Sequence, residues 1–158
     1  RFKASAVAAG ASADRVDAVI ATTDPDPVLL RAKVAALEAV AGTPDFLPIM
    51  KTFKRVLNIT SGQDFPPPRR EMLTEPAELA LFDAVAVTRE QVDAAAQRLD
   101  FDAVLQHALS LEAPVAALFD AVMVEDKDAV IRARRVGLLL QTAGVFRSFA
   151  DFSRVSTR

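Results

Sequence analysis

The chain has 158 residues, of which 51% are apolar and 25% charged, a composition typical of one globular domain rather than of a disordered segment. The formal net charge of −2 argues against a uniformly basic nucleic-acid-binding protein, and the absence of cysteine excludes disulfides, thiolate zinc sites and cysteine nucleophiles. No apolar run reaches the ~20 residues of a membrane span, and the chain opens with neither a signal-peptide pattern nor an initiator Met, so we expect a fragment of a longer chain with no membrane partner.

Apolar residues recur with helical spacing along nearly the whole chain, which predicts an all-α protein. We expect a single bundle of about six to seven helices that spans residues 1–158 as one domain. Capping side chains, acids and prolines indicate the helix starts. In chain order these starts are Asp26-Pro27, Thr43-Pro44, Thr74-Glu75-Pro76, Asp100, Leu111 with Pro114 in the first turn, and Asp126. The last helix is the longest, and we expect it to extend to about Ser153.

Residues 61–72 form a proline-rich linker inside this domain. Ser61-Gly62 ends the preceding helix, and Pro66, Pro67 and Pro68 each lack a backbone N–H and constrain the residue before them. We expect an exposed, polyproline-like segment. The residues before it are too few for a generous core, so the two sides are expected to pack together.

Charges are segregated along the chain. The stretch from Glu71 to Asp128 has 13 acids and 3 bases, whereas the stretch from Ile131 to the end has 6 bases and 1 acid. Residues 46–63 have 3 bases and no acid. Such segregation can direct a positive surface toward phosphates. The alternative is ordinary surface charge that folding mixes again.

A basic stripe is predicted on the helix over residues 43–60. At about 100° per residue, the apolar side chains gather on one side of this helix and four polar side chains gather on the other. The four are Lys51, Lys54, Arg55 and Asn58. Lys and Arg neutralise phosphates and Asn can bind a base edge or a ribose hydroxyl, so the stripe suits a sugar–phosphate backbone. The alternative is a solvated face that keeps an amphipathic helix soluble.

The last predicted helix carries a second cluster of arginines. Asp128, Arg132 and Arg135 share a face, and Asp128 and Arg132 have the i, i+4 spacing of a favourable ion pair. Arg134 lies apart from them. The cluster is either a second phosphate-contacting edge or an ion-pair network that holds the helix to its neighbours. We favour the network for Asp128 and Arg132, and both alternatives stay open for Arg134 and Arg135.

No set of residues indicates a catalytic or cofactor site of the chain's own. The single histidine, His107, is interpreted as structural, because one histidine without clustered acids makes no metal site. The chain contains neither phosphate-binding glycine motif, and nothing indicates a nucleophile elbow. We therefore expect no catalytic residue, metal or cofactor in this piece.

Six short blocks, in order between about Asp14 and Ser153, carry a family resemblance. They are DAVIA at 17–21, FKRVLNI at 53–59, EPAE at 75–78, APVAALFDAVMV at 113–124, the acid and arginines at 128, 132 and 135, and FRSFADFS at 146–153. Together they resemble the C-terminal region of the β subunit of bacterial glycyl-tRNA synthetase, over nearly the whole chain.

The resemblance implies a helical anticodon-binding domain of the DALR type in a cytoplasmic enzyme. The β subunit of that family pairs with a catalytic α subunit, two of each, and the whole enzyme charges tRNA-Gly with glycine using ATP and Mg. Lys54, Arg55 and Asn58 would then lie on the tRNA-contacting side, with Arg132 and Arg135 as further candidates. Arg134 stands where the family has Asn. The alternative function is a helical subunit-docking module with no direct tRNA contact.

Overall fold

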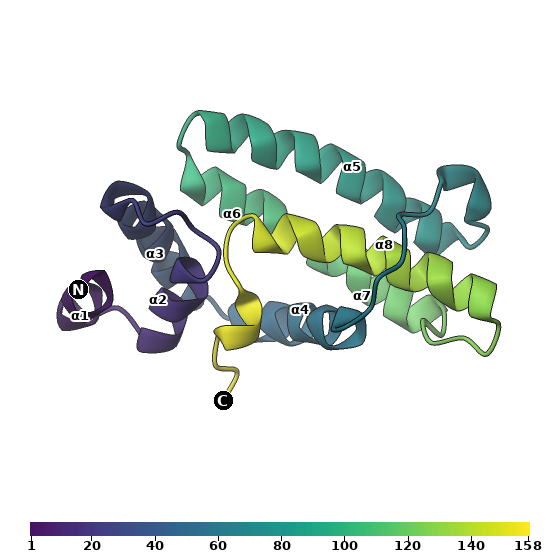
Figure 1. Cartoon of the computed structure of the whole chain (residues 1–158), viewed down its shortest axis with the longest axis horizontal. Coiled ribbons are helices and arrows are strands. Elements are labelled where there is room, and N and C mark those ends of the chain that lie inside the picture. The colour runs from purple at the N-terminus through teal and green to yellow at the C-terminus, as the bar shows by residue number, and fades with distance from the viewer.

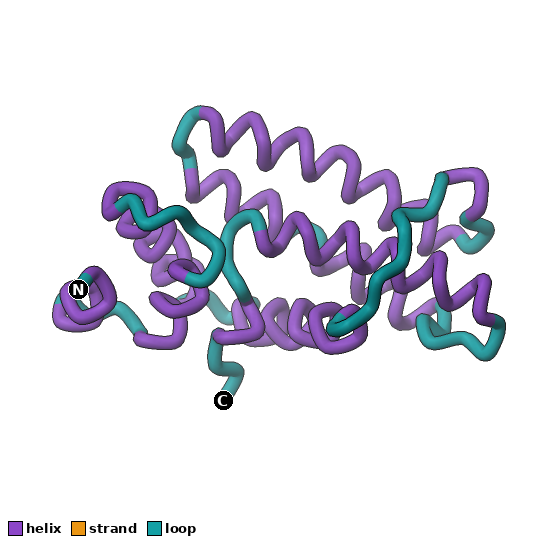
Figure 2. The backbone as a smooth tube through the Cα atoms, viewed as in Figure 1, coloured by secondary structure: helices purple, strands orange, loops and turns teal.

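The computed structural model describes all 158 residues and contains eight α-helices, two short 3-10 helices and no strand, which confirms the all-α prediction. Figure 2 shows how short most of the connecting loops are. The α-helices are α1 (Phe2–Ala8), α2 (Ala13–Ile20), α3 (Pro27–Ala41), α4 (Phe46–Thr60), α5 (Pro76–Gln97), α6 (Phe101–Leu109), α7 (Glu112–Ala121) and α8 (Ala129–Arg147). The 3-10 helices are η1 (Arg70–Met72) and η2 (Phe152–Arg154). None of the helices combines the length and apolarity needed to cross a membrane.

The helices form a bundle in which α8 occupies the middle. Figure 1 shows α5 along one side of α8 and α4 along the other, while α1, α2 and α3 gather at one end. The last residues of the chain return to this end, where η2 packs against α2 and α4. α4 therefore lies at the edge of the bundle, with one face free.

One continuous hydrophobic core of 36 buried residues joins helices from both sides of the proline-rich linker. Its centre is aromatic. The ring of Phe53 on α4 stacks on Phe146 of α8 with 3.7 Å between centroids, and Phe152 of η2 lies 5.5 Å from Phe53. Burial of such rings dominates core energetics, so this cluster fixes α4 against α8.

Most of the predicted helix starts are confirmed. Asp26 caps α3 by accepting a hydrogen bond from the Val28 N–H (2.8 Å), and Asp100 caps α6 by accepting from the Ala103 N–H (3.1 Å). α5 begins at Pro76, and α7 begins just after Leu111 with Pro114 in its first turn. These starts follow from local capping chemistry, which sequence shows directly.

Two starts and one end differ from the prediction. α4 begins at Phe46 rather than Pro44, because the Thr43 hydroxyl donates back to the Val40 carbonyl (2.7 Å) instead of capping a new helix. α8 is capped by Asp128, not Asp126, since Asp128 accepts from the N–H groups that follow it.

α8 ends at Arg147, before the expected Ser153. Beyond it, Lys33 on α3 donates to the carbonyls of Ser148 (3.3 Å) and Phe149 (3.2 Å), and the Asp151 N–H donates to the Ala18 carbonyl (2.9 Å). These bonds to other helices replace the intrahelical bonds that would have continued α8.

The proline-rich linker crosses the face of α8 (Figure 1). A Cβ at Gly137 would lie 2.5 Å from the Pro66 carbonyl oxygen, so the crossing is close and glycine is needed there. Pro66 and Pro67 are exposed as expected, but Pro68 is buried. Contact with α8, which the sequence pattern does not reveal, is the reason for the difference.

Candidate nucleic-acid interface

The predicted basic stripe lies on one face of α4. The opposite face of this helix buries Phe46, Met50, Phe53, Val56 and Leu57 in the core. Within the stripe, Lys51, Arg55 and Asn58 are exposed and Lys54 is partly exposed. None of the three cations takes part in an ion pair. Their charges are therefore free to neutralise an external anion.

The middle of the stripe meets α7. The guanidinium carbon of Arg55 lies 3.9 Å from the centroid of the Phe119 ring, close enough for a cation–π contact. Nearby, the Thr52 hydroxyl donates to the Glu112 carboxylate (3.0 Å). These contacts align the polar face of α4 with the exposed side of α7. The period of α4 alone does not indicate Phe119, because the contact joins two separate helices.

Arg135 on α8 is buried and bound to groups inside the protein. Its Nε donates to the Glu78 carboxylate of α5 (3.0 Å), and its Nη1 donates to the Met123 carbonyl (2.8 Å) and lies 3.5 Å from the Asp126 carboxylate. Glu78 also accepts from the Glu75 N–H (3.0 Å) at the start of α5. Arg135 thus holds together α5, α8 and the loop between α7 and α8.

The other two arginines of α8 differ from each other. Arg134 donates from Nη1 to the Met72 carbonyl (3.0 Å), and its Nε is buried without a partner. Arg132 is exposed and has no side-chain partner. The predicted Asp128–Arg132 ion pair does not form, because Asp128 caps α8 instead. Only Arg132 of the three arginines is presented to an external ligand.

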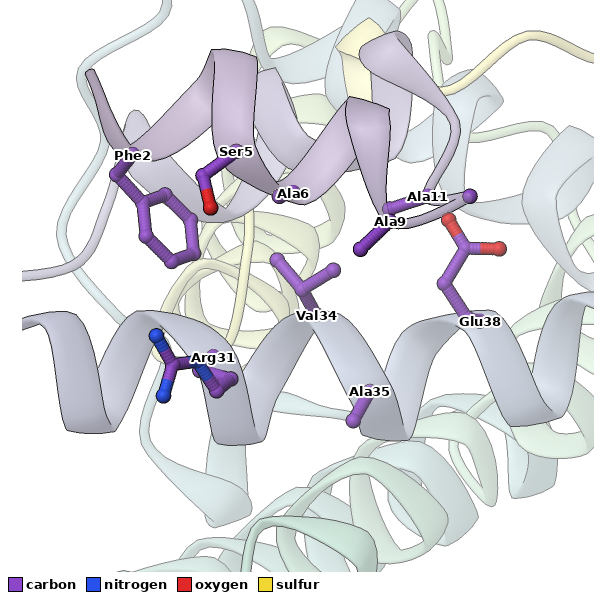
Figure 3. Close-up of a pocket in the computed structure, with 10 residues that line it drawn as sticks. Phe2, Ser5, Ala6, Ala9, Ala11, Arg31, Val34, Ala35 and Glu38 are labelled. Carbon is purple, nitrogen blue, oxygen red and sulfur yellow. The ribbon is translucent and has the colours of Figure 1, made fainter.

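Neither His107 nor a groove at the amino-terminal end of the bundle forms a ligand site that the structure identifies. Half-buried His107 lies on α6, and the structure contains no group of three or more His, Cys, Asp or Glu side chains that could hold a metal ion. A groove of about 360 Å³ lies between α1 and α3, where Phe2 and Ala6 face Val34 (Figure 3). Glu38 at its rim is bound to Arg15 (2.9 Å), so Arg31 is the one free charge beside it. We assign no ligand to this groove.

Comparison with known proteins places these features in a family. The model of the DALR anticodon binding domain matches residues 49–152. The chain is 35% identical over 146 residues to a glycine–tRNA ligase beta subunit of Anaeromyxobacter dehalogenans (strain 2CP-C), and 36% identical over 143 residues to that of Citrifermentans bemidjiense. It is 37% identical over 145 residues to the corresponding subunit of Geotalea uraniireducens (strain Rf4).

These alignments cover 90–91% of this chain but 21% of each relative, so the chain spans about a fifth of the length of the curated relatives it matches. The family model covers well over half of the chain, including most of α4 and all of α5 to α8. The expected all-α fold and the family resemblance are both confirmed, and the chain belongs to the DALR anticodon-binding domain family.

Proposed function

We propose that this chain binds the anticodon arm of tRNA-Gly as part of the β subunit of a glycine–tRNA ligase. The observation that carries the proposal is the stripe of Lys51, Lys54, Arg55 and Asn58, whose cations form no ion pair within the protein. Membership of an anticodon-binding family supports tRNA as the ligand. The names of the relatives support glycine as the amino acid.

The mechanism is positioning rather than chemistry. The lysines neutralise phosphates of the anticodon arm, and Asn58 hydrogen-bonds a ribose hydroxyl or a base edge. The arm is thereby held so that the acceptor end reaches an active site on the α subunit. In this proposal the complete cytoplasmic enzyme contains two α and two β subunits and supplies ATP and Mg.

The three arginines of α8 have different parts in this proposal. Arg132 is exposed and unpaired, which supports a further phosphate contact. Arg135 donates to Glu78, Met123 and Asp126, and Arg134 donates to the Met72 carbonyl. We therefore propose Arg134 and Arg135 as residues that hold α8 to neighbouring segments and not as direct tRNA contacts.

The salt dependence of tRNA binding tests the stripe. In the full-length subunit, Lys51→Ala with Lys54→Ala removes two cations and is expected to weaken tRNA-Gly binding. The slope of log affinity against log salt is negative, and each lost phosphate contact reduces its magnitude by about 0.7–0.9. The double variant is therefore expected to have a slope shallower by about 1.5. The measurement is tRNA affinity at several salt concentrations.

The matched control is Arg31→Ala with Arg98→Ala, which removes two exposed cations from α3 and from the end of α5. It lowers the net charge equally but is expected to leave the slope unchanged. If the α4 variant binds tRNA with the affinity and slope of the parent protein, the stripe does not contact tRNA. The alternative of a subunit-docking module would then account better for this face.

A further inference from the structure

A shallow pocket lies beside the stripe, between α4 and α7. It has a volume of about 260 Å³ and is lined by Lys51, Thr52, Arg55, Ala116, Phe119 and Asp120. Pockets that enclose whole small ligands have volumes of roughly 300–1,000 Å³. This smaller, open hollow suits one flat ring that enters from solvent.

The pocket contains a guanidinium that already lies over an aromatic ring. Phe119 is half-buried and supports Arg55 from one side at 3.9 Å, while Arg55 itself remains exposed. One face of the guanidinium is therefore available to a ligand. Unstacked bases stack on guanidinium planes as well as on aromatic rings. Because Phe119 already orders the arginine, less side-chain freedom is lost when a base stacks on it.

The polar groups at the rim indicate which base fits. Asp120 is exposed and makes no hydrogen bond or ion pair within the protein. Its carboxylate accepts hydrogen bonds and repels phosphate, so the pocket favours a base with an amino group over a phosphate. Lys51, on the opposite helix, remains free for the phosphate of the same nucleotide. Thr52 does not compete for the base, because its hydroxyl is engaged with Glu112.

We propose that Arg55 and Phe119 form a stacking platform for one unpaired base of the anticodon loop, and that Asp120 selects an amino-bearing base over uracil. The proposal rests on the proposed tRNA-binding function and assigns one base contact within it. A purely structural Arg55–Phe119 contact would join α4 to α7 and would show no dependence on any single base.

The test combines protein and RNA changes in the full-length subunit. The protein change is Arg55→Lys, which keeps the charge but removes the guanidinium plane. The RNA probes are the anticodon stem–loop of tRNA-Gly and versions with an abasic nucleotide at each loop position in turn. At one position, loss of the base is expected to weaken wild-type binding about tenfold or more. Loss of the same base is expected to weaken binding by Arg55→Lys much less than it weakens wild-type binding, because the stack on the guanidinium is already lost.

Three further variants test the roles of Phe119 and Asp120 and provide a control. Phe119→Leu removes the supporting ring and is expected to be non-additive with the same abasic position. Arg132→Lys is the matched control, because that exposed arginine has no ring beneath it, and it is expected to show no coupling with any position. Asp120→Asn is expected to reduce the discrimination against uracil at that position, since an amide offers both a donor and an acceptor.

The outcomes separate this proposal from the function on which it rests. A wild-type subunit that does not bind the stem–loop, or that binds it with a salt slope unaffected by the Lys51 and Lys54 changes, overturns both. Normal binding and the expected salt slope, with additive effects of Arg55→Lys and every abasic position, overturn the platform alone. Unchanged discrimination in Asp120→Asn overturns the assigned role of Asp120.

Discussion

Leu99 has a left-handed backbone conformation, with φ of 56°, at the turn between α5 and α6. The Asp100 N–H donates to the Ala95 carbonyl (3.0 Å) and the Leu99 N–H donates to the Ala96 carbonyl (3.0 Å). These two bonds define a Schellman ending, in which glycine is the usual residue at the Leu99 position. The leucine side chain is 62% exposed and gains little from burial.

We expect Leu99→Gly to stabilise the protein by roughly 1 kcal/mol, because glycine adopts this conformation without the steric cost that a Cβ brings. Urea denaturation measures the change in the free energy of unfolding. Ala94→Gly is the matched control, since Ala94 is an exposed position inside α5, and it is expected to destabilise by about 1 kcal/mol. A loss of stability in Leu99→Gly would show that contacts of the leucine outweigh its backbone strain.

For single residues, the sequence predicted which face of a helix a side chain occupies more reliably than which partner it contacts. The period of α4 correctly separated Phe53 and Val56 in the core from the exposed Arg55. It did not predict the partner of Arg55, because Phe119 lies on another helix. For the same reason, spacing on α8 left the role of Arg135 open, and its partner Glu78 emerged only from the packing of α5 on α8.

Helix starts were predictable where one capping group stood alone, as at Asp26 and Asp100. The start of α8 offered two acids two residues apart. Asp126 contacts Arg135, and Asp128 caps the helix. Which of the two acids caps α8 is therefore linked to a tertiary contact that the sequence does not show. Helix α1, which buries no residue, and helix α2, whose N-cap residue Ser12 makes no side-chain capping hydrogen bond, gave no clear start signal.

The crossing of the proline-rich linker over α8 gives a prediction at the level of elements. Gly137→Ala would place a Cβ 2.5 Å from the Pro66 carbonyl, so either the linker or α8 must shift. We expect a net loss of about 2 kcal/mol in the free energy of unfolding, typical of a forced backbone shift, although alanine favours a helix by about 1 kcal/mol. Thermal or urea unfolding measures the loss.

Gly144→Ala is the matched control on the same helix. A Cβ there would meet only the end of the Arg89 side chain, at 3.6 Å, which is ordinary contact. This variant is expected to gain up to about 1 kcal/mol from helix propensity. Equal behaviour of the two glycine variants would mean that the linker does not press on α8.

For the whole molecule, Lys33 is a buried cation that joins the two ends of the chain. Its amine donates to the Thr23 hydroxyl (3.0 Å) and to the Ser148 and Phe149 carbonyls, and no carboxylate pairs with it. Burial lowers the pKa of Lys33 below its ordinary value of 10.5, against a smaller opposing effect of Asp24. The folded protein therefore releases this proton more readily than the unfolded chain does.

This release predicts a specific pH dependence. Between the lowered pKa and 10.5, the unfolded chain binds more protons at Lys33, so the free energy of unfolding rises with pH over that range. Lys33→Met keeps the apolar stem but has no amine that can bind a proton, so it lacks this contribution to the pH dependence. We expect the stability difference, wild type minus Lys33→Met, to increase as pH is raised toward 10.5, measured by urea denaturation at several pH values. Parallel pH curves for the two proteins would contradict a lowered pKa.

The all-helical class was predictable from periodicity, because apolar residues recur with helical spacing along most of the chain. The return of the chain's last residues to α2 was not, because no pattern within either segment encodes the other. Asp151 bonds Ala18, and Thr22 donates to the carbonyl of Phe149, 127 residues further along the chain. Such contacts are decided by the shape of the complete core.

This return has a consequence for how the molecule folds. Helical bundles usually fold fast because their contacts are local in sequence, and closing a long loop costs entropy before any contact repays it. Here the core around α2 and α3 is complete only after Phe149 and Phe152 have been synthesised and have packed against this end of the bundle. During synthesis, part of the apolar surface of the first helices therefore stays exposed until residues more than a hundred positions later have been made.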